Sequence, residues 1–447
     1  MSHEDALDNV EKHNKARVAI CDIDGVLRGK YLHKDKFRSV AESGFGFCNV
    51  VFGWDVADAC YDNVAYTGWH TGYPDADARV DMSTYREIPW NNNVPFFLAD
   101  FVDAEEQPLD VCPRSLLKRV LNEADKLGYA VMSGLEFEFF NFKETAETLA
   151  ERGFYQPQPL TDGMFGYSLI RSTANQPYFQ AIIDEMLQFG VPIEGLHTET
   201  GPGVYEVALS VSDALEAADR AVLFKTGLKE IAGRFGIMPS FMAKWNSRLP
   251  GCSGHIHQSL WNKNKTQNLF FDNGKMSEIF KSYIAGQMLL LPELLPFYAP
   301  TVNSYKRLVE GMWAPTKVTW GIENRTTALR AIPGSAKSTR LELRVPGADI
   351  NPYLALAAAV ASGLYGVKNK LELKAEPIQG NGYEARGAVV LPANLQEAAL
   401  KLKKSKIAPE ILGQGMVEHF VNTRLWEYRQ FQQAVTDWEL KRYFEII

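Results

Sequence analysis

Four short segments alternate polar residues with apolar residues, and this alternation constrains the fold more than any other feature of the chain. A β-strand places successive side chains on opposite faces, so each segment is predicted to be a strand with one charged face and one apolar face. The segments are GLEFEFF (134–140), HTETGPGVYEV (197–207), SGHIHQSL (253–260) and STRLELRV (338–345).

The charged faces of these strands have the composition of a metal site. Glu136 and Glu138 point to one side of a strand, where two carboxylates raise each other's pKa unless a cation lies between them. His255 and His257 share this spacing, and carboxylates with histidine favour Mg²⁺ or Mn²⁺ over zinc because oxygen donors dominate. One such segment alone is typical of a solvated sheet face. Four segments with apolar opposite faces favour a metal site.

Cationic side chains follow within forty residues. The alternative interpretation of these cations is a basic surface. The residues between them are, however, mostly Leu, Ala, Ile, Pro and Val, which are not typical of a surface. Metal ions together with a cluster of cations suit phosphoryl transfer, in which the protein must neutralise spreading oxygen charge. The cations are Arg307, Arg325, Arg330, Lys337, Arg340 and Arg344.

The length of 447 residues predicts about two domains, with a boundary near residue 105. The first part contains a hairpin over 16–32, with Asp24 and Gly25 in its turn. The second alternates strands with amphipathic helices, which the spacing of apolar residues predicts over 112–128, 177–190, 213–236 and 351–371.

The charge and composition exclude several classes of function. A net charge of −7 argues against broad binding of nucleic acid or of an anionic membrane, and the lysines of 401–406 are predicted to be a solvated helix face. No segment has the length and hydropathy of a signal peptide or a membrane span, so a cytoplasmic protein is expected. Five scattered cysteines indicate neither a disulfide framework nor a zinc site.

The chain resembles the glutamine synthetase family nearly from end to end, from DIDGVLRGK (22–30) to VTDWELKRY (435–443). The resemblance implies an α+β fold, with a small β-grasp-like domain over 1–105 and a catalytic domain over 106–447, in which helices surround an antiparallel sheet that lines a funnel. It also implies a homo-oligomer, usually a dodecamer of two stacked hexamers with active sites shared between subunits. The motifs that carry the resemblance occur in the family's order: GLEFEFF, HTETGPGVYEV, GHIHQSL, NSYKRLVEGMWAP, ENRTTALR and RLELRVPGADINPYLALAA.

The family's activity implies ATP, two or more Mg²⁺ or Mn²⁺ ions, glutamate and an amine. By resemblance, the metal nearer glutamate is held by Glu138, Glu199 and Glu206, and the metal nearer ATP by Glu136, His255 and Glu342. Arg307 and Arg344, with His255, match the glutamate side, and Arg325, Arg330, Lys337 and Arg340 match the phosphate side. Glu194 and His257 match positions near the nucleotide, Gly251–Gly254 lies where the family's glutamate-binding loop is, and Asp55 is similar to an aspartate lent by the neighbouring subunit.

One departure from the family pattern bears on the second substrate. Trp313, in RLVEGMWAP, stands where glutamine synthetases have a glutamate that takes a proton from ammonium. Indole cannot accept that proton, so the resemblance favours a γ-glutamylamide synthetase that uses a primary amine larger than ammonia; a glutamine synthetase that uses ammonia is the alternative. Glu310 is either a displaced base or an exposed loop residue, and modification of Tyr383 stays open.

Other classes of protein are less consistent with the sequence. AICDIDGVL matches the start of phosphohydrolases whose first aspartate, here Asp22, is the nucleophile, but their downstream acidic site is absent. GSAKST (334–339) resembles the end of a P-loop, but it lacks the glycine spacing and a strand follows it. A catalytically retired relative would have lost metal ligands, and every matched ligand is present.

Overall fold

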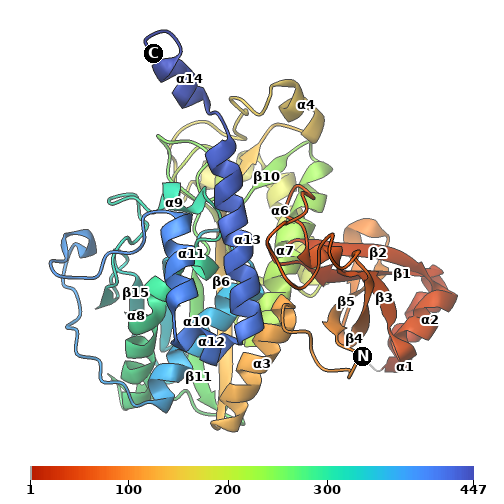
Figure 1. Ribbon diagram of the computed structural model, residues 1–447, viewed down its shortest axis with the longest axis horizontal. Coiled ribbons are helices and arrows are strands. Elements are labelled where there is room, and N and C mark those ends of the chain that lie inside the picture. The colour runs from red at the N-terminus through yellow and green to blue at the C-terminus, as the bar shows by residue number, and fades with distance from the viewer. Residues whose placement is uncertain (1–2) are drawn as a thin grey trace.

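The computed structural model describes residues 3–447, which form two large sheets with helices packed against them (Figure 1). The predicted α+β class is confirmed. In Figure 1 the smaller, N-terminal sheet lies to the right of the catalytic sheet.

The N-terminal sheet has five strands in the order β2-β1-β5-β4-β3. β1 pairs with β5 in parallel and all other pairs are antiparallel. α1 (His3–His13) and α2 (Lys34–Ser43) pack against this sheet over a core that includes Phe37, Phe97 and Phe101. The strands are β1 (Lys15–Cys21), β2 (Leu27–His33), β3 (Phe45–Cys48), β4 (Asp75–Ile88) and β5 (Val94–Val102).

The predicted hairpin over 16–32 is confirmed as the pair β1 and β2. Its connection explains the Asp22 motif without a nucleophile: the buried Asp22 carboxylate accepts hydrogen bonds from the backbone of Asp24 and Val26 and pairs with Arg28 at 2.9 Å. Gly25 has φ +83° and lies against Asn351 of the catalytic domain, where a Cβ would come within 2.9 Å of the Asn351 Cα atom. Asp22 therefore shapes a turn at the junction between the two parts.

The catalytic sheet has nine strands, and its main path runs β14-β15-β16-β11-β6-β8-β7, with β9 and β10 also paired to β6. All pairs are antiparallel except β14 with β15. A separate small pair is formed by β12 (Phe271–Asp272) and β13 (Lys275–Met276). The nine strands are β6 (Tyr129–Phe142), β7 (Ile193–Thr198), β8 (Val204–Leu209), β9 (Ser212–Asp213), β10 (Met238–Ser240), β11 (Ile256–Asn262), β14 (Trp320–Ile322), β15 (Leu329–Ile332) and β16 (Arg340–Leu343).

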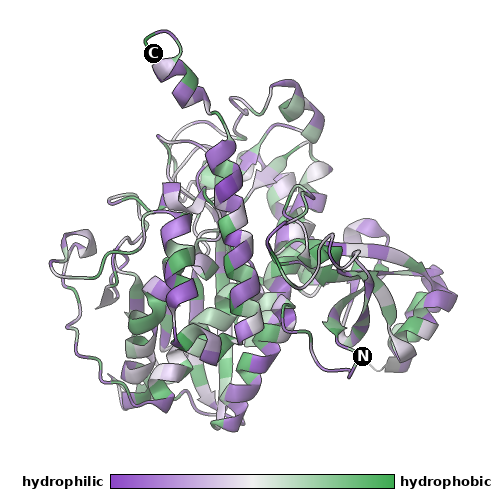
Figure 2. Ribbon diagram, in the orientation of Figure 1, coloured by the Kyte–Doolittle hydropathy of each residue, from purple (hydrophilic) through white to green (hydrophobic). Residues whose placement is uncertain are grey.

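The four predicted helices of the catalytic part are confirmed as α3 (Pro113–Lys126), α6 (Gln176–Gln188), α7 (Ala214–Gly233) and α10 (Pro352–Lys368). The prediction that they are amphipathic is wrong for α10, which is buried on nearly every side and packs chiefly against α8 (Glu278–Tyr298). A helix that is apolar all round belongs to a core and not to a surface. Figure 2 shows the resulting hydrophobic centre, with polar residues on the outer helices.

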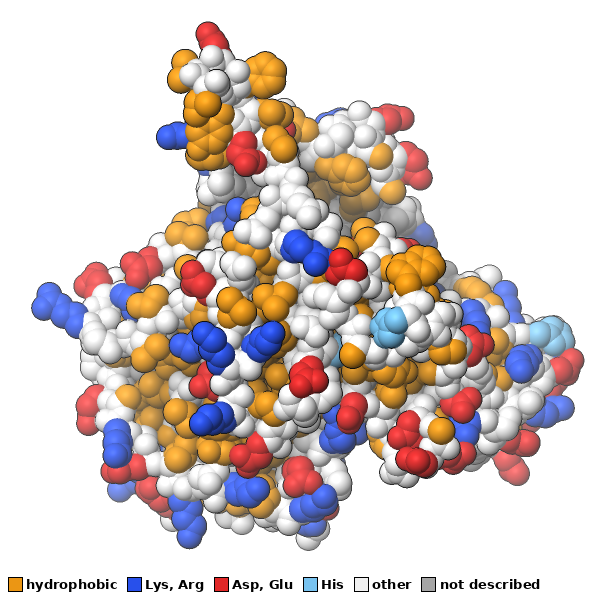
Figure 3. Space-filling view, viewed as in Figure 1, with side chains coloured by type: hydrophobic (Ala, Val, Ile, Leu, Met, Phe, Trp, Pro, Cys, Tyr) orange, Lys and Arg blue, Asp and Glu red, His pale blue; other side chains and the backbone are white. Residues whose placement is uncertain are grey.

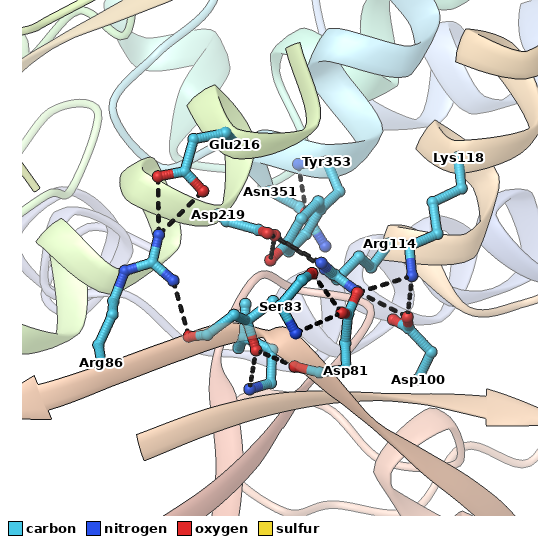
Figure 4. Close-up of polar contacts among 12 residues, drawn as sticks. Asp81, Ser83, Arg86, Asp100, Arg114, Lys118, Glu216, Asp219, Asn351 and Tyr353 are labelled. Carbon is cyan, nitrogen blue, oxygen red and sulfur yellow. Dashed lines mark hydrogen bonds and ion pairs between the residues drawn. The ribbon is translucent and has the colours of Figure 1, made fainter. Parts of the chain in front are cut away.

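A buried polar network joins the N-terminal sheet to the catalytic helices (Figure 4). At its centre, the Arg114 guanidinium on α3 pairs with Asp100 of β5 at 2.7 Å and with Asp219 of α7 at 2.8 Å. Tyr353 of α10 donates a hydrogen bond to Asp219 at 2.6 Å, and Lys118 pairs with Asp100. The network fixes β5 against α3, α7 and α10.

The C-terminal segment forms an arm that projects from the rest of the chain (Figures 1 and 3). It follows α13 (Gln414–Gln433) and contains α14 (Asp437–Tyr443). Large apolar side chains on it are exposed, among them Trp438, Phe444 and Ile446, of which Phe444 is 85% exposed. Among residues 3–447, no helix is long and apolar enough to cross a membrane. The lysines of 401–404, on α11 (Leu395–Lys404), are solvent-exposed, as predicted.

Candidate active site

The charged faces of the alternating segments come together on one side of the catalytic sheet. β6 pairs with β8 so that Glu138 lies opposite Glu206, and β11 pairs with β16 so that His257 lies opposite Glu342. On the other face of β6, Phe137 and Phe139 are fully buried against Phe224 of α7. The period of two thus separates a polar site from the hydrophobic core.

Carboxylates and histidines form a cluster at the centre of this polar face. The Nδ1 atom of His255 lies 3.4 Å from Glu136 and 3.5 Å from Glu342. A second group forms where His197 lies 3.8 Å from Glu199 and 3.7 Å from Glu206. Three triads have ligand atoms within 4.8 Å of one another: Glu136, Glu206 and His255; Glu136, His257 and Glu342; and His197, Glu199 and Glu206.

The electrostatics of the cluster favour a bound cation. Burial raises the pKa of Glu206 to about 9, and the neighbouring carboxylates of Glu138 and Glu136 add to the shift. Burial also raises the pKa of Glu138. Burial and then the charge of Arg344 lower the pKa of His255 to about 4, so its imidazole is neutral near pH 7, and its buried Nε2 atom has no hydrogen-bond partner. Repelling carboxylates and an orphaned neutral imidazole nitrogen are what divalent metal ions bind, so the residues fit such ions.

The pKa of the neighbouring Glu342 carboxylate is shifted in the opposite direction. Burial acts to raise the pKa of Glu342, but interactions with His255 and Arg344 outweigh it and lower that pKa to about 2. Arg330 pairs with the same carboxylate at 2.9 Å, and Arg344 pairs with its other oxygen. Glu342 is therefore held ionised between two guanidinium groups.

His257 is oriented by a cation. Arg340 Nε donates a hydrogen bond to His257 Nδ1 at 3.1 Å. A guanidinium can only donate, so Nδ1 accepts and the ring proton lies on Nε2, which is 3.0 Å from Glu136. In this tautomer Nε2 has no free lone pair for a metal ion, and among the described residues it has no hydrogen-bond partner.

A pocket of about 530 Å³ opens beside this part of the cluster. Its apolar wall includes Met132, Val211 and Trp261. The residues predicted for the nucleotide that line it are Glu194, His257, Lys337 and Arg340. Residues from three separate parts of the sequence thus meet at one pocket.

The residues predicted for the glutamate side cluster around the loop at Gly251–Gly254. Arg307 is buried and donates to Ser253 Oγ and to the Val345 carbonyl, both at 2.9 Å. The Ser253 backbone amide donates to the Glu138 carboxylate at 2.6 Å. Arg344 Nε donates to the carbonyl of Arg325, whose own side chain is exposed.

Two loops lie next to each other beyond Arg307 and Arg344. Trp313 has φ +59° and is 61% exposed. Lys317 links the loops, because its ammonium pairs with Glu310 at 3.1 Å and donates to the Tyr383 carbonyl. Burial raises the pKa of the Tyr383 phenol, opposed by the charges of Arg344 and Arg307 and by the Trp313 backbone. Glu310 itself is more than half exposed.

Some positions were missed by the sequence analysis, or stay apart from the cluster. His197 and Tyr167 were missed. Their rings are tilted by 32° with centroids 4.4 Å apart, and the sequence signal for His197 was its His-x-Glu spacing to Glu199. Asp55 belongs to the N-terminal part, where its carboxylate accepts from the backbone of Ala57 and Ala59. Its role in a neighbouring subunit's site stays a prediction.

Comparisons with known proteins agree with this geometry. Residues 110–443 match the family model of the glutamine synthetase catalytic domain. A type-1 glutamine synthetase 2 of Dictyostelium discoideum is 55% identical, over 100% of this chain and 87% of the relative. A glutamate–isopropylamine ligase of a Pseudomonas species is 37% identical, over 98% and 97%. The solved structure of a GmaS/ADP complex superposes with a TM-score of 0.85 at 27% identity, over 98% of this chain and 99% of that one.

The fold and the site together define an ATP-dependent carboxylate–amine ligase. More specifically, the chain belongs to the glutamine synthetase family, whose model spans three quarters of its length.

Proposed function

We propose that the protein joins the γ-carboxylate of glutamate to a primary amine larger than ammonia, through a γ-glutamyl phosphate. The single observation behind this choice is Trp313, which occupies the position of the family's proton-accepting glutamate with an apolar indole. The reaction has two steps. The γ-carboxylate oxygen attacks the terminal phosphorus of ATP and ADP leaves; the amine nitrogen then attacks the acyl carbon, loses a proton, and phosphate leaves.

Two divalent metal ions fit the carboxylate–histidine cluster. When bound, such ions neutralise negative charge on the phosphates and on the transferred group. We assign Glu136, His255 and Glu342 to the ion nearer ATP, and Glu138, Glu199 and Glu206 to the ion nearer glutamate. The imidazole of His197 lies 3.8 Å from Glu199 and 3.7 Å from Glu206 of the second set. The hydrogen bond from Arg340 to His257 supports a role for His257 as a donor on the nucleotide side.

The cations beside the cluster orient the two anionic substrates. Arg330 and Arg344 are held in place by Glu342, so their remaining N–H groups can receive phosphate and carboxylate oxygens without a further loss of side-chain freedom. Lys337 and Arg340 line the pocket predicted for the nucleotide. Arg325 is exposed on the loop before β15, from which it can reach a phosphate. Arg307 donates a hydrogen bond to Ser253, in the loop predicted to bind glutamate, and this supports a role on the glutamate side.

The amine end that we propose contains the indole of Trp313, whose backbone lies beside the Tyr383 phenol. Methylene groups buried against such rings contribute about 0.8 kcal/mol each, which ammonia cannot gain. A cationic amine over the indole face gains a further ~0.5–2 kcal/mol before it loses its proton. Glu310 is a weak candidate for the base, because Lys317 already pairs with it at 3.1 Å. We infer that these rings select amines by their carbon chain.

A second candidate, ligation of ammonia, is favoured by one specific observation. The relative that is 55% identical over the whole chain is a type-1 glutamine synthetase 2. In that case a group other than residue 313 would take the proton from ammonium.

A panel of amines distinguishes the two candidates. Phosphate release would be measured with ATP, Mg²⁺ or Mn²⁺, glutamate and one of ammonia, methylamine, ethylamine, isopropylamine or ethanolamine. We expect kcat/KM for one primary amine to exceed that for ammonia at least ~10-fold, which is about 1.4 kcal/mol of transition-state binding. If ammonia is the best nucleophile, the protein is a glutamine synthetase. If no amine supports phosphate release, the ligase assignment itself fails.

A further inference from the structure

A cavity of about 1040 Å³ lies between the hairpin turn of the N-terminal part and the catalytic domain. It is on the core side of the catalytic sheet, opposite the carboxylate cluster, because its wall includes Lys225 of α7, whose ammonium lies 5.7 Å from the ring of Phe137. Phe137 and Glu136 point to opposite faces of β6. The cavity is therefore separate from the site described above.

Three cations line this cavity, and among residues 3–447 none of them has an acidic partner within ion-pair distance. Lys225 and Lys229 are one helical turn apart on α7, and Arg248 comes from the loop before Gly251. By contrast, the buried cations Arg114 and Arg424 pair with Asp219 and Asp24. Lys225 is partly buried, whereas Lys229 and Arg248 are exposed, so the cavity presents positive charge that no acidic side chain of the described residues pairs with.

Lys225 has an environment that costs stability. Its ammonium donates to the Ile350 carbonyl at 2.9 Å and lies 5.4 Å from the Phe241 ring, also within reach of Lys229. Burial, together with the charge of Lys229, lowers the pKa of Lys225 to about 8. A carbonyl and an aromatic face offset only part of the desolvation of an ammonium group, so a bound anion would complete the compensation.

The acidic groups of the cavity wall do not fill this role. Asp24 is already paired with Arg424. Asp349 accepts hydrogen bonds from the hydroxyls of Thr301 and Ser304 through one carboxylate oxygen and lies outside ion-pair distance of Lys225. The rest of the wall is largely aromatic and apolar, including Phe142, Tyr155, Phe241 and Trp245.

We propose that this cavity binds a small organic anion, with a carboxylate or phosphate group on Lys225 and Lys229 and an apolar or aromatic body against the surrounding rings. The volume exceeds what a simple inorganic ion needs, and pockets of this size typically hold drug-sized ligands. Carboxylate and phosphate share the charge that the lysines recognise, so probes of both kinds are needed.

The test is a thermal shift and calorimetric titration of the full chain with AMP, phenylacetate and inorganic phosphate. All titrations contain saturating ADP, Mg²⁺ and glutamate, so that a probe cannot report the active site. We expect AMP or phenylacetate to bind saturably with a rise in Tm, and inorganic phosphate to bind at least ~10-fold more weakly because it lacks an apolar body. Which organic probe binds tells phosphate and carboxylate ligands apart.

Substitutions at the cavity make the test specific. Lys225→Met keeps a long unbranched side chain and removes its charge, so we expect probe affinity to fall at least ~10-fold. The control is Lys401→Met, at an exposed lysine of α11, which should leave probe affinity unchanged. Lys229→Met gives the same reading if Lys225→Met does not fold. The proposal is overturned if neither organic probe binds the wild-type chain, or if the cavity variants bind a probe as well as the wild type does.

Discussion

Glu206 is a residue whose charge is tolerated only when something neutralises it. It lies on β8 beside Glu138, and burial raises its pKa to about 9. Between the ordinary pKa of a glutamate and about 9, the folded state holds a proton that the unfolded state has lost. Raising the pH through this window therefore lowers the free energy of unfolding of the metal-free chain.

The first prediction follows from this sign. In EDTA, the free energy of unfolding should fall from pH 5 to pH 9, and Glu206→Gln should remove up to about 1.4 kcal/mol of that fall per pH unit. Saturating Mg²⁺ or Mn²⁺ should flatten the wild-type profile. The control is Glu410→Gln, at an exposed residue of α12 (Ile407–Leu412), which should keep the wild-type slope. Urea unfolding at each pH measures the effect, and a Glu206→Gln profile parallel to the wild type would exclude the mechanism.

Trp313 carries the second prediction. Trp313→Glu restores a carboxylate at the amine end, so the ratio of kcat/KM for the best alkylamine to that for ammonia should fall at least ~10-fold. Trp313→Gln is the matched control, because it removes the indole without supplying a base; it should lose alkylamine use and gain no ammonia use. The amine panel measures both. An unchanged ratio in Trp313→Glu would mean that residue 313 does not select the amine.

Some properties of single site residues could be predicted from the sequence, and others could not. Glu136, Glu138, Glu206, His255 and Glu342 could be predicted to share a face, because a strand has a fixed period of two. Which carboxylate is ionised could not, because it depends on burial and on partners distant in the sequence, such as Arg344 for Glu342. The contact of Tyr167 with His197 also escaped, because it joins a loop to a strand.

At the scale of elements, strands and helices were predictable where a period or a cap marked them, as in α3, which begins at Pro113 and is followed by Gly128 at φ +92°. The path of the catalytic sheet was not predictable from the residues alone, because β11 joins β6 to β16 across long stretches of sequence. The family resemblance implied an antiparallel sheet but no order of its strands. The boundary near residue 105 stays a prediction.

The third prediction concerns the junction between the two parts. Arg114→Met leaves Asp81, Asp100 and Asp219 near one another with Lys118 as the remaining nearby cation, so the free energy of unfolding should fall by about 3–5 kcal/mol. Arg119→Met on the same helix is the control, because its pair with Asp110 is long, at 3.8 Å, and its partner is exposed; it should cost less than about 1 kcal/mol. Urea unfolding measures both variants. Equal losses in the free energy of unfolding would show that the buried network stabilises the chain no more than the exposed ion pair does.

For the whole molecule, the projecting arm predicts self-association. Exposed Trp438, Phe444 and Ile446 form apolar surface far from the chain's own core, which a second copy can cover. We therefore infer a homo-oligomer, and the family resemblance favours a dodecamer.

The fourth prediction is that deletion of residues 436–447 lowers the assembly mass measured by light scattering. Phe444→Asp should act in the same direction, and Phe444→Leu, which keeps an apolar side chain, should not. If the truncated chain keeps the full assembly mass, the arm is not an essential contact.

The pairing of β6 on both of its edges has a consequence for the rate of amide hydrogen exchange. It is hydrogen-bonded to β11 and β9 along its first half and to β8 and β10 along its second, so its amides are shielded on both edges. Deuterium should enter residues 131–141 last, at a rate set by global opening of the chain, whereas the loop around Trp313 should exchange within the first time points. Mass-spectrometric exchange of the two peptides tests this. Glu136 and Glu138 would then lie on the segment of the chain that exchanges most slowly, and Trp313 on one of the segments that exchange fastest.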